Sequence, residues 1–597
     1  MSSETLKGAQ MLVEYLVREN VKYAFGVCGH GIIGFLDALY DRQDAIHTIT
    51  AHDEQAAGFM ADAYYRITHK PAVTYTSSGP GSLNLAMAVA NAFYDSSAFL
   101  AITGNVPTQQ FNRGPFQESG RFFQGDFNNV MRPYVKRTYQ AFRPEMIPLI
   151  ARQAFGLMTT GRPGPVHVDV PLNVFVEEAE VDIPDPAAWR HGVSDRSGGD
   201  PDVIQRAARL LVEAERPVML GGNGVFLSGA IAEFSELSAL LGMPVITSPL
   251  GKGAVDESAP LNLGPTGRNG PYAANQAARN SDVLLALGTR FDDRPTSSWA
   301  PGVTYSIPPT RLIHVDIDPQ EIGRNYPVEI GILGDVRTVL RQLIEAVRPE
   351  AEAARARHAS WRETAVQWKE TWERALAPLR TSGGSPIHPS RLVADLGALL
   401  PDDSIVLADV GIHHNWLIQQ LVLPPKGRFL QAWGFAAMGF GVAGAIGAKF
   451  AAPDRPVVAV CGDGGFLMTA NAVATAVEYD LPIVWVVWNN SGYGSIYGQQ
   501  ATFFGPNREI ATRFRREETG ELLSADFAML GRSMGAAGYT ATTPEQFREA
   551  LSSALALSRP AVIDVAVDES QSAPSTGSWD LPPLAGPAPN FTPDSLA

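Results

Sequence analysis

Two polar side chains follow neighbouring apolar stretches in the C-terminal third of the sequence. Asp463 comes directly after VVAVCG, and Asn490 closes the next apolar stretch, IVWVVWNN. Because the carboxyl ends of neighbouring parallel strands meet at one edge of a sheet, we expect both side chains there. Their oxygens suit a hard divalent cation, and nearby glycines let backbone N–H groups approach a phosphate at a helix start; these are Gly462, Gly464 and Gly465. The pattern therefore predicts a site for a metal-bound phosphate, although an isolated Gly-Asp-Gly is also typical of a tight turn.

A further acid, Glu54, stands at the start of a helical pattern of small and apolar residues, AHDEQAAGFMADAYY. An acid in the first turn of a helix often only faces the positive end of the helix dipole. A poorly solvated carboxyl group, in contrast, has a raised pKa and can share its proton with a ligand. The Ala-Ala-Gly that follows leaves room for another surface beside it. The pattern alone leaves both interpretations of Glu54 open, an acid that faces the helix dipole and an acid that transfers a proton.

Apolar runs that alternate with helical patterns must position these groups. Such alternation predicts parallel, doubly wound sheets, so the expected fold class is α/β with three such domains in series. The expected strands are YAFGV, IHTIT, AVTYT, AFLAIT and PVHVDV in the first domain, PVML, PVIT, DVLLAL and LIHVDI in the second, and SIVLAD, PVVAVCGD, PIVWVVWNN and PAVIDVAV in the third. The predicted limits are 1–182, 200–345 and 390–568 for the three domains, 346–389 for a charged, solvated helical connector and 569–597 for an irregular tail or lid.

Composition narrows the class of protein. The chain has 597 residues, 45% of them hydrophobic, and a net charge of -15, which disfavours nucleic acid or an anionic membrane as the main partner. No apolar stretch is long enough for a membrane span, and the first twenty residues read as an amphipathic helix rather than a secretory signal. With only two cysteines, a disulfide framework is not expected. A small-molecule enzyme of the cytoplasm fits best.

The stretch from 457 to 494 resembles the fingerprint of the thiamine diphosphate-dependent decarboxylases and carboligases, Gly-Asp-Gly followed by Asn-Asn. The resemblance implies a pyrimidine-binding, a central and a diphosphate-binding domain. It implies Mg2+ held by Asp463, Asn490 and the carbonyl of Gly492. Further implied cofactor contacts are Met438 under the cofactor, the Ala436 carbonyl, and Gly411 and His413 at the diphosphate.

The same resemblance gives Glu54 a definite role. In this family a glutamate shares a proton with the aminopyrimidine ring, and it belongs to a different subunit from the diphosphate site. The resemblance therefore implies active sites at a dimer interface, and it makes a homotetramer the expected assembly.

Several stretches are similar to the acetolactate synthase branch in particular. GPFQESG implies that Phe116 lines the substrate pocket and that Gln117 reaches the cofactor, and LGTRFDDRPT implies that Arg294 binds a substrate carboxylate. The residues matching that branch's FAD site are Gly222, Arg290, Asp316 and Asp335. FAD, another adenine nucleotide or an empty site all stay open for the central domain.

Two features depart from that branch. His30 replaces a small residue near the reacting carbon, and we predict that it donates or accepts a proton. Gln499 stands where the branch has a substrate-sizing Trp, with Ser495 and Ile496 along the approach. The prediction is thus a carboligase for 2-keto acids, with a 2-hydroxyacyl-CoA lyase, an oxalyl-CoA decarboxylase or a cyclic-dione hydrolase as alternatives, and a non-catalytic scaffold as a remote one.

Overall fold

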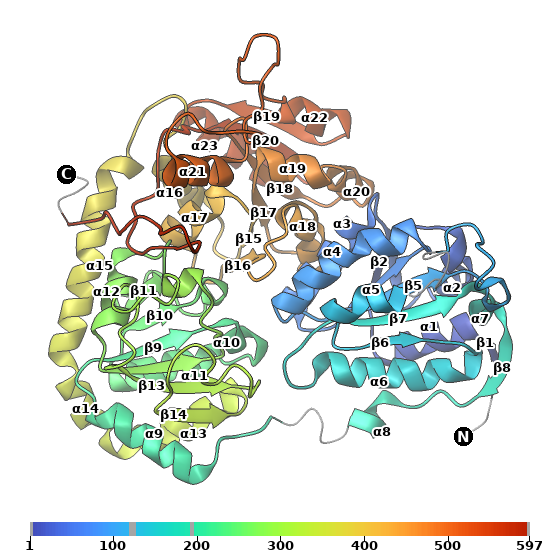
Figure 1. Cartoon of the computed structure of the whole chain (residues 1–597), viewed down its shortest axis with the longest axis horizontal. Coiled ribbons are helices and arrows are strands. Elements are labelled where there is room, and N and C mark those ends of the chain that lie inside the picture. Colours follow the sequence, from blue (N-terminus) through green and yellow to red (C-terminus); the bar gives the residue numbers. More distant parts are fainter. Residues whose placement is uncertain (1–3, 119–126, 191–195, 594–597) are drawn as a thin grey trace.

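The computed structural model describes residues 4–118, 127–190 and 196–593, which contain three six-stranded parallel sheets in series (Figure 1). The predicted fold class is therefore confirmed. Each sheet has helices on both faces, as long parallel sheets require. None of the helices in the described ranges has the length and apolar character that a membrane span needs.

The N-terminal sheet, in blue and cyan in Figure 1, has the strand order β3-β2-β4-β5-β7-β6. Of its four interior strands, β4, β5 and β7 are buried along their whole length. One face is covered by α1, α2 and α6 and the other by α3 and α4. The bounds are β2 (Tyr23–Gly26), β3 (His47–Thr50), β4 (Val73–Thr76), β5 (Leu100–Asn105), β6 (Thr138–Gln140), β7 (Val166–Pro171), α1 (Gly8–Arg18), α2 (Ile33–Tyr40), α3 (Glu54–Thr68), α4 (Pro80–Tyr94) and α6 (Ile147–Thr159).

The start of the chain differs from the sequence prediction. Glu4–Lys7 form a strand, β1, which pairs antiparallel with β8 (Glu178–Val181). The amphipathic helix α1 begins only at Gly8, where a Cβ would lie 2.1 Å from the Val174 carbonyl oxygen. The strand pairing, which depends on a partner more than 170 residues away, overrides the local helical pattern.

The C-terminal sheet repeats the N-terminal topology, with the order β16-β15-β17-β18-β20-β19. Helices α18, α19 and α20 pack on one face and α16, α17 and α23 on the other. The bounds are β15 (Ile405–Ala408), β16 (Arg428–Gln431), β17 (Val457–Gly462), β18 (Ile483–Asn489), β19 (Ala537–Ala541), β20 (Ala561–Ala566), α16 (Pro389–Leu399), α17 (Ile412–Gln420), α18 (Phe440–Ala451), α19 (Asp463–Thr469), α20 (Ala472–Glu478), α21 (Gly494–Phe504), α22 (Phe527–Ser533) and α23 (Pro544–Leu555).

The central sheet has a different order, β11-β10-β9-β12-β13-β14. This is the order of dinucleotide-binding sheets, in which ligands bind where the winding direction reverses, here between β9 and β12. The bounds are β9 (Pro217–Gly221), β10 (Val245–Thr247), β11 (Asn262–Pro265), β12 (Val283–Leu287), β13 (Arg311–Asp316), β14 (Ile330–Leu333), α9 (Pro201–Glu213), α10 (Asn223–Leu227), α11 (Ile231–Leu241), α12 (Tyr272–Asn280) and α13 (Val336–Val347).

The connector is less solvated than predicted. It forms α14 (Ala351–Arg357) and the long helix α15 (Ala359–Arg380), in yellow in Figure 1. Trp361 and Trp372 of α15 are buried, Trp361 against the central domain and Trp372 against Phe591 of the tail. The apolar face of α15 was not recognised in the sequence because many charged residues lie on its opposite face.

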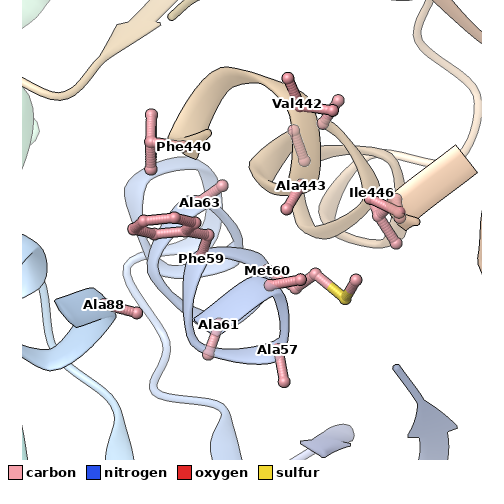
Figure 2. Close-up of a cluster of buried hydrophobic side chains, with 14 of the residues drawn as sticks. Ala57, Phe59, Met60, Ala61, Ala63, Ala88, Phe440, Val442, Ala443 and Ile446 are labelled. Carbon is pink, nitrogen blue, oxygen red and sulfur yellow. The ribbon is translucent and has the colours of Figure 1, made fainter. Parts of the chain in front are cut away.

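One hydrophobic core joins the N- and C-terminal domains. Helix α3 packs against α18, and Figure 2 shows Phe59 and Met60 of α3 beside Phe440 and Ile446 of α18. The helices approach so closely that a Cβ on Gly447 would lie 1.9 Å from the Met60 carbonyl oxygen. This contact fixes how the helix that begins at Glu54 is oriented relative to the C-terminal sheet.

Candidate active site

Glu54 lies in a cavity of about 760 Å³ whose lining residues all come from the N-terminal domain. It is the first residue of α3, next to the N-cap Asp53. Asn84 of α4 donates its side-chain amide to Asp53 at 2.8 Å and to Glu54 at 2.9 Å. A Cβ on Gly81 would lie 2.9 Å from Glu54 Oε1, so this glycine leaves the space that the carboxylate occupies. The acid is thus held at a fixed place on the cavity wall.

The rim of this cavity is apolar and open. Leu83 is 59% exposed and Met87 is 44% exposed, both on α4 beside Glu54. Glu54 itself is half-buried in the single chain, less than the sequence analysis expected. Fuller burial of its carboxylate requires a second surface over this rim.

His30 and Gln117 line the same cavity. The ring of His30 stacks on Phe116 with ring centres 5.6 Å apart. Its neighbour Gly31 donates its backbone N–H to Ser77 Oγ at 3.3 Å, so the loop lies against the end of β4. Gln117 has a left-handed backbone with φ 64°, and its Oε1 is buried without a hydrogen-bond partner among the described residues. The structure therefore brings Glu54, His30, Phe116 and Gln117 together, with one amide oxygen free for a ligand.

Asp463 lies at the carboxyl end of β17, as predicted, and begins α19. Its carboxylate accepts backbone hydrogen bonds from Gly464 at 2.7 Å, Gly492 at 3.0 Å and Asn490 at 3.2 Å. Burial raises the pKa of the Asp463 carboxyl to about 6. Asp463, Asn490 and Gly492 are thus brought together at one edge of the sheet.

The predicted diphosphate turn lies beside this acid. His413 is buried at the start of α17, and burial lowers the pKa of its ring to about 3. Its Nε2 is buried with no partner among the described residues. A Cβ added to Gly411 would lie 2.6 Å from Cε1 of the His413 ring, and a Cβ added to Gly462 would lie 3.3 Å from the same atom. Both glycines therefore border the histidine. The two glycine motifs, some fifty residues apart in sequence, therefore form one surface.

A buried acid that the sequence analysis missed supports the loop carrying Ala436 and Met438. Asp409 accepts hydrogen bonds from the backbone of Gly439 at 2.9 Å and Gly441 at 3.1 Å, and burial raises its pKa to about 6. A Cβ on Gly465 would lie 2.2 Å from Asp409 Oδ2 and 3.9 Å from Met438 Cε, so Met438 lies next to the glycine run. Ala436 has a left-handed φ of 55°.

The predicted substrate residues of the C-terminal domain lie on α21, a helix with no buried residue. Gln499 donates to Ser495 Oγ at 3.4 Å, and Ile496 is 48% exposed. Arg294 belongs instead to the central domain, where its guanidinium lies over the ring of Trp579 from the tail. These residues do not border the Glu54 cavity.

A cavity of about 580 Å³ lies between the N-terminal and central domains. Three of the four predicted FAD residues line this cavity, namely Arg290, Asp316 and Asp335. Gly222 does not line it and packs instead against Gly288, where a Cβ on Gly222 would lie 2.1 Å from the carbonyl oxygen. Burial raises the pKa of Asp316 to about 6. Asp335 caps α13 and pairs with Arg196 at 3.0 Å. The cavity volume is in the range typical of cofactor sites. The cavity also lies where the winding direction of the central sheet reverses, which is where such sheets bind ligands.

Family models match all three domains. They are the thiamine pyrophosphate enzyme N-terminal binding domain at residues 6–124, the central domain at 204–343 and the C-terminal binding domain at 409–565. The chain is 36% identical over 586 residues to a protein of Methanocaldococcus jannaschii named "probable acetolactate synthase large subunit", covering 95% of this chain and 93% of that protein. The chain belongs to the thiamine diphosphate-dependent enzymes, in the acetolactate synthase-like branch.

Bacterial members of the branch match with similar coverage. The acetolactate synthase isozyme 3 large subunit of Escherichia coli is 32% identical, over 95% of this chain and 96% of its own. The acetolactate synthase large subunit of Corynebacterium glutamicum is 33% identical, over 95% of this chain and 87% of its own. The similarity therefore covers the central domain and the connector as well as the two cofactor domains.

The residues of this thiamine diphosphate enzyme fit its cofactor in two separate halves. Gln117 Oε1 in one half and His413 Nε2 in the other are buried polar atoms without partners among the described residues. Buried polar atoms are normally paired, so both point to a polar ligand. None of the C-terminal site residues borders the Glu54 cavity, whose lining runs from Cys28 to Gln117. Sequence reasoning missed Asn84, Gly81 and Asp409, which carry no spacing signal and depend on contacts between helices.

Proposed function

We propose that this acetolactate synthase-like enzyme uses thiamine diphosphate and Mg2+ to join 2-keto acids through a carbon–carbon bond. The observation that carries the proposal is that both half-sites are complete. Glu54 is held on the wall of one, and Asp463 with Asn490 stands at the sheet edge of the other. A non-catalytic scaffold would have no need to keep both.

In this proposal the cofactor supplies an electron sink for the bond that breaks during decarboxylation. Asp463, Asn490 and the carbonyl of Gly492 hold Mg2+, for which carboxylate, amide and carbonyl oxygens are suitable ligands. The buried Nε2 of His413 supports a contact with the diphosphate, because a ring N–H there gains the partner that it lacks. The glycines around His413 leave the space for that group.

Glu54 would hold at its carboxylate the proton that passes to the pyrimidine ring once the cofactor is bound. The Asn84 amide and the N-terminus of α3 keep its carboxylate in place. Covering the open rim of Leu83 and Met87 would exclude water from the carboxylate, so that its proton is exchanged with the ligand and not with solvent. His30, stacked on Phe116, is placed to exchange a proton with the substrate, and Gln117 orients the cofactor through its free amide oxygen.

The second surface over the rim is assigned to another copy of the chain. Exposed apolar side chains flank both half-sites, Leu83 and Met87 beside Glu54 and Leu467 and Met468 on α19 behind Asp463. Contiguous exposed apolar side chains mark interaction surfaces. This supports a homodimer with active sites at the interface, and we propose that it assembles further into a tetramer in the cytoplasm. Leu83→Glu should shift the oligomer toward monomer in light scattering, whereas Tyr40→Glu on the opposite face of the sheet should not.

The central cavity is assigned to FAD. The winding reversal, the volume and the lining by Arg290 and Asp316 support a dinucleotide there. Purified protein should be yellow and should release flavin on denaturation. A colourless protein whose thermal stability rises with ADP but not with FAD would instead assign the cavity to an adenine nucleotide.

Product analysis tests the central proposal. The full-length protein is incubated with thiamine diphosphate, Mg2+ and either a panel of 2-keto acids or 2-hydroxyacyl-CoAs, and products are identified by mass spectrometry. A ligated 2-hydroxy-3-keto acid, formed only when both cofactors are present, is the expected result. Cleavage of a 2-hydroxyacyl-CoA without any ligation would reject the carboligase in favour of a lyase.

A further inference from the structure

Two arginines of the central domain lie side by side because their backbones are joined. The Arg268 N–H donates to the Arg294 carbonyl oxygen at 3.0 Å. The preceding residue, Gly267, has a φ of 96°, and a Cβ there would lie 2.2 Å from the same oxygen. Only a glycine permits this approach, so the juxtaposition of Arg268 and Arg294 is built into the fold.

A tryptophan from the C-terminal tail covers both guanidinium groups. The guanidinium carbon lies 5.0 Å from the Trp579 ring centre for Arg268 and 4.4 Å for Arg294. Both distances are in the range of cation–π contacts. The indole N–H donates to Asp293 Oδ2 at 2.7 Å, which fixes the plane of the ring.

The tail is anchored at this point by a strained turn. Ser297, Ser298 and Trp299 have left-handed φ values of 52°, 55° and 58° in succession, which is costly for residues other than glycine. The hydroxyl of Ser297 accepts the Ser578 N–H at 3.1 Å, and that of Ser298 accepts the Asp580 N–H at 2.8 Å. The strained turn therefore holds the two neighbours of Trp579. Such strain is typical of sites where position matters.

Arg294 is attracted electrostatically by the carboxylate of its neighbour Asp293, and Arg268 by no acid among the described residues. Within the described ranges, neither side chain forms a hydrogen bond or salt bridge with an acid, and the carboxylate beside Arg294, Asp293, is engaged by Trp579. Burial and, to a smaller extent, the nearby Arg294 together lower the pKa of Arg268 to about 10. In contrast, Arg290 in the central cavity pairs with Asp292 at 3.3 Å. A close, poorly solvated pair of like charges is unfavourable unless an anion binds between them.

The pair lies next to the cofactor half-site of the same chain. Asn269, the residue after Arg268, donates its side-chain amide to Asn415 Oδ1 at 2.7 Å. Asn415 belongs to α17, whose first turn carries His413. An anion held by the arginines therefore lies at the side of the helix that begins at the diphosphate turn.

We infer that Arg268 and Arg294 together bind a 2-keto acid that carries a second acidic group, with Trp579 as the positioning residue; this rests on the proposed function. A substrate with one carboxylate satisfies one guanidinium and leaves the other uncompensated. A dicarboxylate satisfies both, and bidentate arginine–carboxylate pairs are strong and directional.

Binding of unreactive probes tests the inference. Glutarate, with two carboxylates, and butyrate, with one, are titrated calorimetrically into the full-length enzyme with thiamine diphosphate and Mg2+ present at constant ionic strength. The wild type should bind glutarate about 10- to 100-fold more tightly, the effect of one further charge-assisted contact. Arg268→Gln should abolish this preference and keep butyrate binding, whereas Arg294→Gln should weaken both. Trp579→Phe, which keeps the ring but loses the bond to Asp293, should lower the preference in part.

A matched control separates this effect from general loss of charge. Arg311→Gln removes an exposed arginine of the same domain that pairs with Glu329 at 2.8 Å, and it should leave the preference unchanged. If Arg268→Gln does not fold, Arg268→Lys, which keeps the charge without the bidentate geometry, should show a reduced preference. Equal affinities for the two probes in the wild type, or an unchanged preference in the Arg268 variant, overturn the inference. Ligation of pyruvate with no preference for dicarboxylates would leave the proposed function standing, whereas glutarate preference without cofactor-dependent turnover would reject that function alone.

Discussion

The N-terminal and C-terminal sheets share one topology but use it for different chemistry. In each, strands numbered in chain order read 2-1-3-4-6-5, and in each an acid is the first residue of a helix that follows a strand. The acids are Glu54 after β3 and Asp463 after β17. What differs is the set of donors around them. Glu54 meets one side-chain amide in an open cavity, whereas Asp463 meets three backbone N–H groups in a buried edge.

In the proposed mechanism that difference separates a group that exchanges a proton from a group that holds a charge. A carboxylate beside an open apolar rim loses its contact with water when a second surface covers it. A carboxylate tied by the backbone has a fixed geometry, which metal coordination requires. An acid at the start of a helix can therefore serve catalysis in one sheet and binding in the other, after the second strand in chain order for Glu54 and after the third for Asp463.

Replacing Glu54 should have the largest effect. Glu54→Gln keeps the size of the side chain and its bond to Asn84 but removes the proton, so turnover should fall by about 10²- to 10⁴-fold. Binding of thiamine diphosphate, followed by near-ultraviolet circular dichroism, should change little. The control is Glu118→Gln, outside the cavity. Near-normal turnover of Glu54→Gln would remove the acid from the mechanism and with it the contrast between the two sheets.

Asp463→Asn should show the opposite pattern. Loss of the anionic ligand should weaken the Mg2+-dependent binding of thiamine diphosphate by about tenfold or more, since charge-assisted contacts are about twice as strong as neutral ones. Saturating cofactor should restore part of the turnover, which it cannot do for Glu54→Gln. The measurement is cofactor affinity as a function of Mg2+ concentration. If affinity were unchanged and only turnover fell, both acids would act in the same way.

Two glycine substitutions test how firmly Glu54 and the C-terminal acid Asp409 are held. Gly465→Ala places a Cβ 2.2 Å from the buried Asp409, so stability should fall by about 1–3 kcal/mol. Gly81→Ala meets the carboxylate at the end of the Glu54 side chain, which can rotate away from Asn84, and alanine favours the helix by up to about 1 kcal/mol, so stability should hold or rise while turnover falls. Urea unfolding and turnover are measured for both. Equal destabilisation by the two changes would show that Glu54 is as rigidly placed as the C-terminal acids.

The sequence predicted the interior of each sheet better than its edges. Interior strands such as β5 and β17 are buried on both faces and therefore read as continuous apolar runs. Of the six edge strands only β3 was expected; β6, β11, β14, β16 and β19 were missed. Edge strands are short and partly solvated, so their composition does not differ from that of loops, and only pairing with a neighbour reveals them.

The candidate site likewise contains residues that the sequence predicts and residues that it does not. Asp463, Asn490 and Glu54 were found because their place at a strand end or helix start has a sequence signal. Arg268 and Trp579 had none, because one follows a loop glycine and the other lies in a Pro-rich tail more than 300 residues away. Arg268 and Trp579 come into contact only because the turn at 297–299 holds the tail in place. Sequence reasoning could not identify those candidate site residues whose position depends on long-range contacts.

The smallest expected effect on turnover concerns a buried histidine that belongs to the N-terminal sheet alone. Both ring nitrogens of His167 on β7 contact threonines, Thr103 at 2.8 Å and Thr138 at 2.7 Å, and burial lowers the pKa of the ring to about 3. A neutral ring can donate through one nitrogen and accept through the other. In the unfolded chain the ring binds a proton below about pH 6.5, whereas the folded state does not until about pH 3. The stabilisation is therefore complete above pH 6.5 and is lost as the pH falls toward 3, by up to about 1.4 kcal/mol per pH unit. His167→Gln should flatten the fall in unfolding free energy between pH 6.5 and 4, while His47→Gln, exposed on β3, should keep the wild-type slope. An unchanged slope in His167→Gln would mean that the ring is already protonated in the folded state and that the network around Thr103 carries a charge.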